Sequence, residues 1–325
     1  TKYEYDRSGN TPYTYLPFSQ TGNGKYQPGD QLAFYRTATQ VAHSKYPYAE
    51  IKRESSSLNR IVEQSAPGDA WKIGSGHTIR TSYKTNAANT IRLFRDNGLG
   101  TWAANSSFYA ANTLNLEERT DENDQVTRTY TDHAGRTVAT SQKTGNRWLT
   151  THCIYDYRGR LIYVVPAMAL SEMATLADYT LSAGLVDRWV YAYTYDEHGR
   201  MATKKLPGKG QEYLIYNAKD QLLLSQDSNM RADGVWMYYK YDGLGRQVMT
   251  GFLPDGGIII SEGGPVSRND MQAWIDIQEY ALFERRTPAR GNILGYTNDA
   301  FPEHDETMVV SVTYYDDYLV DTRET

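Results

Sequence analysis

The sequence predicts a mainly β fold built from tandem antiparallel hairpins, with two helical insertions. Three observations lead to this prediction. A short pattern, Tyr-Asp-x-x-Gly-Arg, recurs along the chain, and the residues beside it alternate between apolar and polar. Tyrosine is also unusually frequent, with 28 Tyr against 7 Phe. Alternation with a period of two residues is typical of strands, and tyrosine suits strands that are packed but border water.

The clearest copy of the pattern lies in residues 236–251, which read W-M-Y-Y-K-Y-D-G-L-G-R-Q-V-M-T-G. Asp242 suits the first position of a type I turn, because its carboxylate can accept the backbone N–H two residues later. Gly245 suits a position with positive φ, where the chain enters the partner strand through a bulge. We therefore interpret each copy as the turn of a β-hairpin.

Further copies follow one another after about 20–25 residues in most cases, a period that fits one hairpin per repeat. The longer step between Asp156 and Asp196 implies an insertion. A degenerate copy covers residues 120–126, and Thr131 stands where the next copy would have its tyrosine. Asn217 replaces the aspartate and keeps its turn hydrogen bond. The residues predicted to carry the structural motif are Tyr5, Asp6, Gly9, Asp132, Gly135, Arg136, Tyr155, Asp156, Gly159, Arg160, Tyr195, Asp196, Gly199, Arg200, Tyr216, Asn217, Tyr241, Asp242, Gly245 and Arg246.

An arginine follows the turn glycine in four of these copies. A guanidinium can stack on an aromatic ring and can bond a carboxylate through two parallel N–H groups. We therefore expect each arginine to pack on a neighbouring tyrosine or to pair with a neighbouring aspartate. Either contact would join successive hairpins.

The insertion is predicted to be helical over residues 166–187, which are rich in Ala, Leu and Met. Leu170, Met173, Ala177 and Leu181 recur at helical spacing, and Gly184 is placed to end the helix.

A second helix is predicted over about residues 267–286. Ser267 and Asp270 form a capping pair at its start, and Met271, Trp274, Ile275, Gln278 and Leu282 share one face. Arg285 and Arg286 lie near the expected end, where the helix dipole favours cations. Both helices are expected to cover or plug a sheet.

These elements divide the chain into three predicted regions. Residues 1–113 form a β- and loop-rich region, with short strands expected at 33–35 and 79–83 and a plain loop at 74–77. That loop lacks the spacing and the Lys-Ser/Thr ending of a phosphate loop. Residues 114–251 form the repeat sheet with its helical insertion. Residues 252–325 contain the second helix and a return to strands.

Composition excludes several classes of protein. A net charge of -5 argues against a nucleic-acid-binding surface, which needs a basic excess or stripe. No apolar run reaches the roughly 18–20 residues of a membrane span. Cys153 is the single cysteine, so an intrachain disulfide and a thiolate metal cluster are both impossible. We expect it to be a buried structural thiol.

The repeated pattern resembles the YD repeats of the Rhs (rearrangement hotspot) family, which also occur in insecticidal toxin complex C proteins and teneurins. Residues 236–251, 295–302 and 312–318 resemble Rhs-like proteins of Bacteroidota in particular. The resemblance covers roughly residues 114–318, and residues 1–100 match the family's amino-terminal region only loosely. It implies a curved or spiralling sheet, part of a hollow shell that encloses a carboxy-terminal segment, often a toxin.

Both ends of the chain look cut, because a turn motif begins at Tyr5 and a tyrosine-rich run nearly reaches the last residue. We therefore expect a piece upstream of the family's conserved core, secreted or displayed on the cell surface. Its expected partners are that core and the carboxy-terminal effector of the same chain. Self-cleavage in the family uses Asp residues of the core, so the resemblance brings no catalytic residue to this chain.

The residues themselves offer no catalytic, cofactor-binding or metal site. None of the six histidines (43, 77, 133, 152, 198 and 304) forms the zinc-protease pattern, and no Gly-x-Ser-x-Gly elbow occurs. The carboxylates at 305–306 and 316–317 are adjacent in sequence. Adjacent residues of a strand point to opposite faces, so Asp316 and Asp317 cannot act on one substrate. We predict a structural, non-enzymatic role.

An alternative is a cell-surface adhesin or carbohydrate-binding module built from the same repeats. Exposed aromatic rows pack on sugar rings, and Trp102, Trp148 and Trp236 are candidates for such a surface. Strand packing explains these tryptophans equally well.

Overall fold

The computed structural model describes residues 4–18, 31–37, 44–96, 102–104, 107–254, 267–287, 293–303 and 308–315. The chain divides into two compact units. Unit 1 comprises residues 1–154 and 166–180, and unit 2 comprises residues 155–165 and 181–325. Each unit is mainly β, with antiparallel strands and a few short helices, which confirms the predicted fold class.

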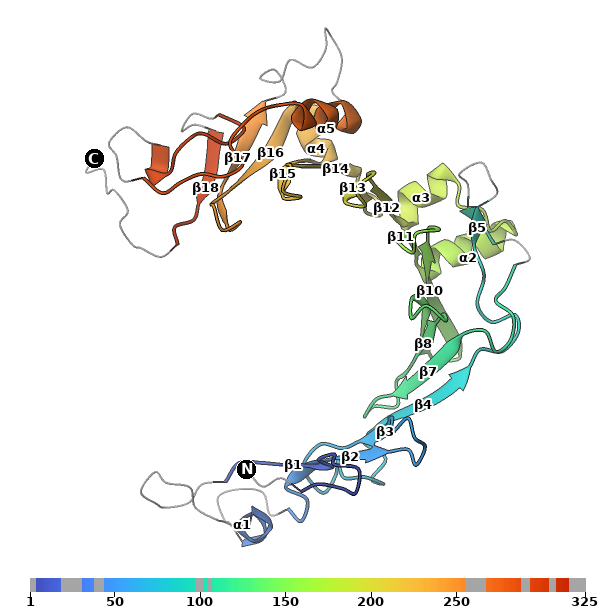
Figure 1. Cartoon of the computed structure of the whole chain (residues 1–325). Coiled ribbons are helices and arrows are strands. Elements are labelled where there is room, and N and C mark those ends of the chain that lie inside the picture. Colours follow the sequence, from blue (N-terminus) through green and yellow to red (C-terminus); the bar gives the residue numbers. More distant parts are fainter. Residues whose placement is uncertain are drawn as a thin grey trace, which may run out of the picture. The chain divides into compact units, whose positions relative to one another are not determined.

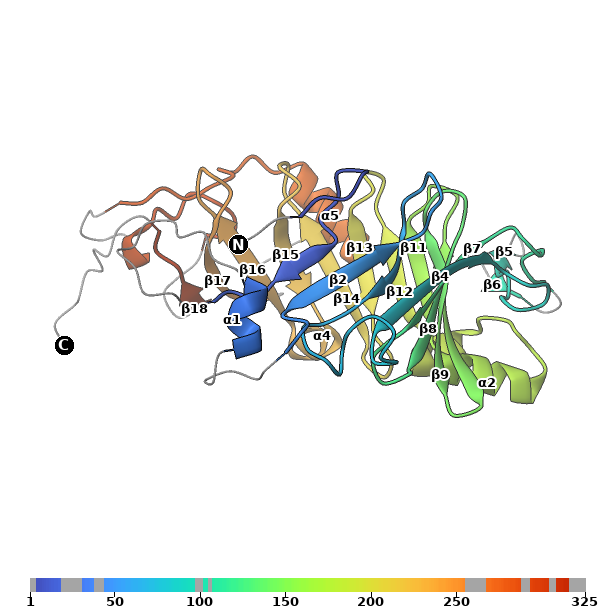
Figure 2. The same cartoon turned by 90° about the horizontal axis from the view of Figure 1, so that it is seen from below.

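In unit 1, the strands of the main sheet lie in the order in which they occur in the chain, and neighbouring strands run antiparallel. Figure 2 shows its strands at residues 79–85, 115–120, 126–131 and 137–144. Two short strands and two helices complete the unit. The sheet order is β1 (Tyr13–Tyr15), β2 (Tyr48–Arg53), β3 (Ile61–Gln64), β4 (Ile79–Thr85), β7 (Asn115–Thr120), β8 (Val126–Thr131), β9 (Thr137–Thr144) and β10 (Arg147–Tyr155), with β5 (Arg95–Asp96), β6 (Trp102–Ala103), α1 (Gln31–Thr37) and α2 (Ala167–Leu176) outside it.

Unit 2 has the same sequential order of antiparallel strands (Figure 1). Its elements are β11 (Leu161–Val165), α3 (Ala183–Trp189), β12 (Tyr191–Tyr195), β13 (Met201–Lys205), β14 (Gln211–Tyr216), β15 (Leu222–Gln226), α4 (Ser228–Asp233), β16 (Val235–Tyr241), β17 (Gln247–Pro254), α5 (Arg268–Asp276), the 3₁₀ turn η2 (Ile293–Gly295) and β18 (Val309–Val312).

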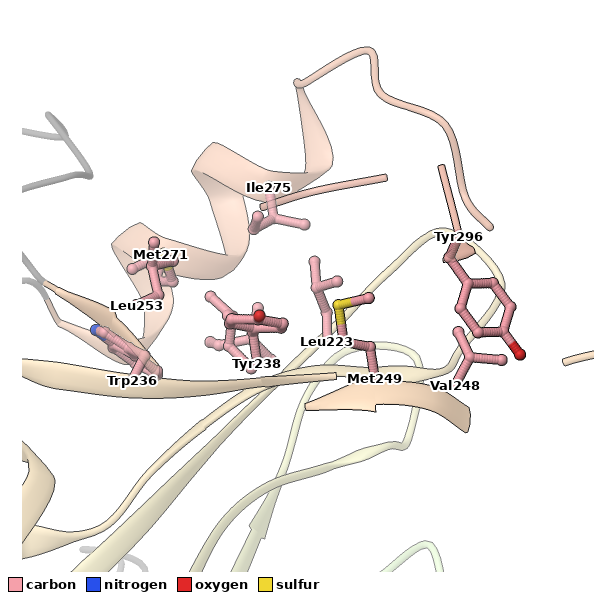
Figure 3. Packing of buried hydrophobic residues seen from close by; sticks show 11 residues of the cluster. Leu223, Trp236, Tyr238, Val248, Met249, Leu253, Met271, Ile275 and Tyr296 are labelled. Carbon is pink, nitrogen blue, oxygen red and sulfur yellow. The ribbon is translucent and has the colours of Figure 1, made fainter. Parts of the chain in front are cut away.

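The core of unit 2 lies between one face of its sheet and α5. Trp236 and Tyr238 of β16 are fully buried, and Met271 and Ile275 of α5 point toward them (Figure 3). Side chains alternate along a strand, so Met237 and its cross-strand partner Phe252 belong to the opposite face. Phe252 is 40% exposed there. The sheet of unit 2 therefore has one covered face and one face that is open to solvent in part.

The insertion forms two short helices in place of the single one predicted. The first, α2, ends at Ala177, which adopts a left-handed conformation with φ 53°. A new helix, α3, begins after Ser182, whose hydroxyl accepts the backbone N–H of Leu185. Gly184 therefore lies inside α3, and the prediction that it ends a helix is wrong. The hydrogen bond from the Leu185 N–H to the Ser182 hydroxyl favours the start of a new helix over extension of α2.

The second predicted helix is also shorter than expected. Ser267 caps α5 as predicted, accepting the N–H of Asp270. The helix stops at Asp276, so the expected extension to 286 is wrong. The reason is long-range pairing. The backbone N–H of Glu284 donates to Tyr241, which draws the segment after α5 onto the end of β16 in an extended form.

Three expectations concern the amino-terminal region, and the first of them is wrong. Residues 33–35 belong to the helix α1 rather than to a strand, because Gln31 and Tyr35 are buried together one helical turn apart. The strand expected at 79–83 is confirmed as β4. Residues 74–77 form turns with positive φ at Gly74 and Gly76, as a plain loop should.

Candidate functional site

The turn around Asp242 shows the local geometry of the repeat. The Asp242 carboxylate accepts the backbone N–H groups of Leu244 and Arg246, each at 2.9 Å. The N–H of Gly245 donates to the Asp242 carbonyl at 3.0 Å, and Gly245 has φ 81°. The strand register shifts between Lys240 and Tyr241, which marks the bulge. Asp242 and Gly245 in the repeated sequence pattern predicted these contacts, which are confirmed.

Other copies take the same turn, including the two degenerate ones. Asp124 and Asp220 occupy the glycine position with φ 60° and 59°. Aspartate tolerates this left-handed region better than most residues, so these turns close without glycine. In each of these turns, one side chain accepts the backbone N–H groups of the residues two and four positions later. These side chains belong to Asp6, Asp121, Asp132, Asp156 and Asn217.

Substitution of Gly245 tests the turn. Gly245→Val should lower the free energy of unfolding by roughly 1–2 kcal/mol, because a β-branched residue is strained at this φ. Gly243→Val in the same turn is the control, since Gly243 is not among the positive-φ glycines. Urea titration of both variants provides the comparison, and equal losses would mean that backbone conformation is not the cause.

Each motif arginine binds the aspartate of its own turn. The Nε atoms of Arg136, Arg160, Arg200 and Arg246 donate to the second carboxylate oxygen at 2.7–2.8 Å. At Asp242, burial raises the pKa of the carboxyl, but the backbone N–H and the guanidinium of Arg246 outweigh it and hold the pKa below its ordinary value. The Asp242 carboxylate is therefore ionised, and the guanidinium of Arg246 in the same turn neutralises its charge.

Arg160, Arg200 and Arg246 also reach the next repeat. The guanidinium of Arg160 lies over the ring of Tyr195 at 4.7 Å, and the Tyr195 hydroxyl donates to the Leu161 carbonyl at 2.8 Å. We call this pair of contacts the inter-repeat clasp: an arginine under the next tyrosine, whose hydroxyl binds the carbonyl just after that arginine. Further clasps join Arg200 to Tyr216 (5.0 Å, with Met201 at 2.9 Å) and Arg246 to Tyr315 (4.4 Å, with Gln247 at 3.2 Å).

A clasp that the sequence analysis missed lies in unit 1. Arg60 stacks on Tyr83 at 4.1 Å, and the Tyr83 hydroxyl donates to the Ile61 carbonyl at 3.0 Å. Glu54 binds Arg60 in place of the usual aspartate. This copy does not match the repeated sequence pattern, because its turn is longer and Glu54 stands in place of the aspartate. The signal that remains is an arginine, an apolar run and a tyrosine about one repeat later.

Removal of one clasp arginine should be measurable. Arg160→Met loses both the ion pair to Asp156 and the stacking on Tyr195, so we expect a loss of about 1–2 kcal/mol. Arg158→Met is the matched control, because Arg158 contacts the exposed Tyr157 and its own turn and, among the described residues, is not part of a clasp. Thermal unfolding followed by circular dichroism gives the comparison. An unchanged melting temperature for Arg160→Met would contradict the clasp as a source of stability.

The remaining candidates from the sequence are placed as follows. Trp236 is fully buried, so its assignment to a sugar-binding surface is wrong. Trp148 lies under the guanidinium of Arg128 at 3.9 Å. Burial raises the pKa of the Cys153 thiol, which is half-buried. Within the described ranges, no three His, Cys, Asp or Glu side chains are grouped to hold a metal. The carboxylates at 305–306 and 316–317, and the histidines at 43 and 304, lie outside the described residues.

Comparisons with known proteins add the following. Residues 1–85, which end with the last residue of β4, match a domain of unknown function, DUF6443. None of the curated proteins compared with the chain matches it. None of the described helices has the length and apolar character needed to cross a membrane.

Among solved structures, the chain is similar to part of the TcdB2–TccC3 complex. The complex as a whole and the complex without its hypervariable C-terminal region match with TM-scores of 0.47 and 0.49, each at 14% identity over 95% of this chain. The Photorhabdus luminescens Tc holotoxin pore matches with a TM-score of 0.37 at 13% identity over 81% of this chain. This chain spans only 14% of the length of each of these relatives.

Proposed function

We propose that the chain is a non-enzymatic wall segment of a larger Rhs-like protein that encloses a carboxy-terminal effector. The inter-repeat clasp is the observation that carries the proposal. It joins consecutive repeats in each unit, so the sheet extends by adding hairpins and needs no closed globular core. Such a linear arrangement is suited to building a wall of large area from a short repeated sequence.

The two faces of unit 2 support the same role. The covered face carries the apolar core under α5. The opposite face carries hydroxyl pairs, in which Ser225 meets Tyr239 at 3.0 Å and Thr250 meets Ser311 at 2.7 Å. These hydroxyl pairs, with the ion pair of Lys204 and Glu212 on the same face, leave the face polar and its charges paired. A surface of that kind would hold a cargo chain without binding it tightly. The proposal includes export to the medium or the cell surface, which the resemblance implies.

The test uses the parent gene product, including any residues that follow Thr325. It is digested with a broad-specificity protease, and the products are identified by mass spectrometry. We expect a carboxy-terminal segment to survive inside a nicked wall and to be toxic when it is expressed alone. The variant Arg200→Met/Tyr216→Phe, which weakens one clasp, should expose that segment to the protease, whereas Arg158→Met should not.

Two outcomes would contradict the proposal. A gene product that ends at Thr325 has no effector to enclose. Rapid digestion of the carboxy-terminal segment, with no harm on its expression, would favour an adhesin or another surface module.

A further inference from the structure

Lys240 occupies a position of the repeat that is apolar in other copies. It lies two residues before the turn aspartate Asp242, and its side chain is 0% exposed. Trp236 and Tyr238 precede it on the same face of β16 and are also fully buried. The corresponding residues of three other copies are buried and apolar, namely Tyr130, Ile154 and Ile215. An ammonium in such a place costs desolvation free energy that an apolar side chain does not, so stability alone does not explain this lysine.

Two side chains from the segment after α5 meet the Lys240 amine. Its Nζ donates to Glu284 Oε1 at 2.7 Å and to Asn298 Oδ1 at 2.9 Å. The Asn298 Cγ atom is bonded to Oδ1 at about 1.2 Å, so Nζ and Cγ lie no more than about 4.1 Å apart. A shift of about 1 Å or less, with rotation of the amide, brings the carbonyl carbon to the distance at which an amine can attack it.

Glu284 holds the asparagine in place from both sides. Its Oε2 accepts the Thr297 hydroxyl at 2.6 Å and the Asp299 N–H at 3.1 Å, and its Oε1 accepts the Ala300 N–H at 3.1 Å. Thr297 and Asp299 flank Asn298 in the sequence, so one carboxylate positions both the amide and the amine that faces it. Fixed geometry of this kind raises the effective concentration of two reacting groups.

The surroundings favour a neutral amine at Lys240. Burial lowers the pKa of Lys240, although the hydrogen bond to Glu284 opposes that shift. A cavity of about 10 Å³ beside Lys240, lined by Tyr280 and Phe301 among others, has room for about one molecule of the size of water or ammonia. In so enclosed a site, transfer of a proton from the ammonium to the carboxylate removes two buried charges at once. The amine then has the lone pair that a nucleophile needs.

We propose that Lys240 and Asn298 become joined by an amide bond between their side chains, in a reaction of the chain itself with Glu284 as the proton carrier. The Lys240 ammonium gives a proton to the Glu284 carboxylate, and the neutral amine attacks Cγ of Asn298. Glu284 delivers that proton to the amide nitrogen of Asn298 and takes one from the attacking nitrogen. The bond from Cγ to the amide nitrogen breaks, and ammonia leaves, carrying the remaining proton from Glu284 as ammonium.

The reaction needs no oxidant, reductant or second substrate, because one bond from nitrogen to Cγ replaces another. The new bond would link two positions 58 residues apart and would tie the segment after α5 to β16 covalently. A cross-link between distant residues restricts the unfolded chain. Until the bond forms, Lys240 and Glu284 remain an ion pair. The inference does not depend on the proposed wall role, because the three side chains all belong to unit 2.

The test measures the mass of the full chain of residues 1–325 after purification near neutral pH. The chain should weigh about 17 Da less than its sequence, the mass of one ammonia molecule. Trypsin should then release a branched peptide, in which residues 232–246, uncut after Lys240, are joined to residues 291–323. Tandem mass spectrometry should place the link at Lys240 and Asn298.

Three variants separate the roles of the side chains. Asn298→Ala removes the carbonyl group that is attacked but leaves the ion pair of Lys240 with Glu284, so this variant should have the full mass of its sequence. Glu284→Gln keeps the shape of the side chain without the proton acceptor, and should lower the linked fraction at least tenfold. The control is Asn269→Ala, which removes an exposed amide elsewhere in unit 2 and should lose ammonia as the unmodified chain does.

Three results would overturn the proposal. The first is an unmodified, folded chain that has the full mass of its sequence. The second is a loss of ammonia without the branched peptide, which would assign the loss to cyclisation of a single asparagine. The third is a linked fraction in Glu284→Gln equal to that of the unmodified chain, with a circular dichroism spectrum of the folded chain, which would remove Glu284 from the reaction.

Discussion

Replacement of Lys240 by methionine is expected to lower the free energy of unfolding of unit 2 by about 3–5 kcal/mol, because it leaves a buried carboxylate without its cation. Lys240 and Glu284 are both 0% exposed and lie 2.7 Å apart. Burial lowers the pKa of Lys240, and the pairing with Glu284 opposes that shift. The Glu284 carboxylate also accepts the Thr297 hydroxyl at 2.6 Å and the Ala300 N–H at 3.1 Å. The pair therefore anchors the whole segment after α5 to the sheet.

Tryptophan fluorescence during urea unfolding measures this effect, since Trp236 lies in the same core. The control is Lys204→Met, which breaks the partly exposed cross-strand pair with Glu212 at 2.9 Å. Pairs of that kind contribute only about 0–1 kcal/mol. If Lys240→Met and Lys204→Met lower the free energy of unfolding equally, burial does not make the Lys240–Glu284 pair more stabilising than an exposed pair.

The second large effect is a loss of stability of unit 1 in mild acid, through His152. This side chain is buried on β10, where its Nε2 accepts the Arg92 N–H at 3.2 Å and its ring meets the edge of Phe94. Burial, with a smaller contribution from the charge of Arg92, lowers its pKa to about 4 from its ordinary value of 6.5. The folded chain thus holds the neutral imidazole, whereas the unfolded chain binds a proton below pH 6.5.

The sign of the effect follows from that difference. The unfolded state takes up the proton first, so stability is complete above pH 6.5 and falls as the pH falls toward 4. The full loss is about 3 kcal/mol. His152→Gln keeps a hydrogen-bond acceptor and removes the titration, so its stability should vary less between pH 7 and 4. His133→Gln, at an exposed turn position, should follow the unmodified chain. Parallel curves for all three proteins would exclude His152 as the acid-sensitive group.

The local features of the fold could be predicted from the sequence because their causes are local. The turn around Asp242 depends on one carboxylate and one glycine within four residues, and the cap of α5 depends on Ser267 and Asp270. Asp124, in the turn of the degenerate copy, shows that the same turn tolerates an imperfect motif.

The features that escaped prediction depend on contacts between distant residues. The early end of α5 follows from Glu284 binding Lys240, 44 positions away in the sequence. The clasp between Arg60 and Tyr83 escaped notice because Glu54 stands where the pattern has aspartate. A cavity lined by Arg268 lies where the pairing of β13 with β14 ends, and no pattern of residues in the sequence predicts the end of that pairing.

Cysteine accessibility in the parent protein tests whether one face of the repeat sheet lines an enclosed space. In a Cys153→Ala background, Phe252→Cys places a thiol on the open face of unit 2, and Ile277→Cys places one just after α5, at a position that is 76% exposed. Both are treated with a maleimide carrying a polyethylene glycol chain of about 5 kDa, which is too large to enter a closed shell. We expect both thiols to react in the chain of residues 1–325, and only the thiol of Ile277→Cys to react in the parent protein. Labelling of Phe252→Cys to the same extent as Ile277→Cys in the parent protein would contradict an enclosed space on that face.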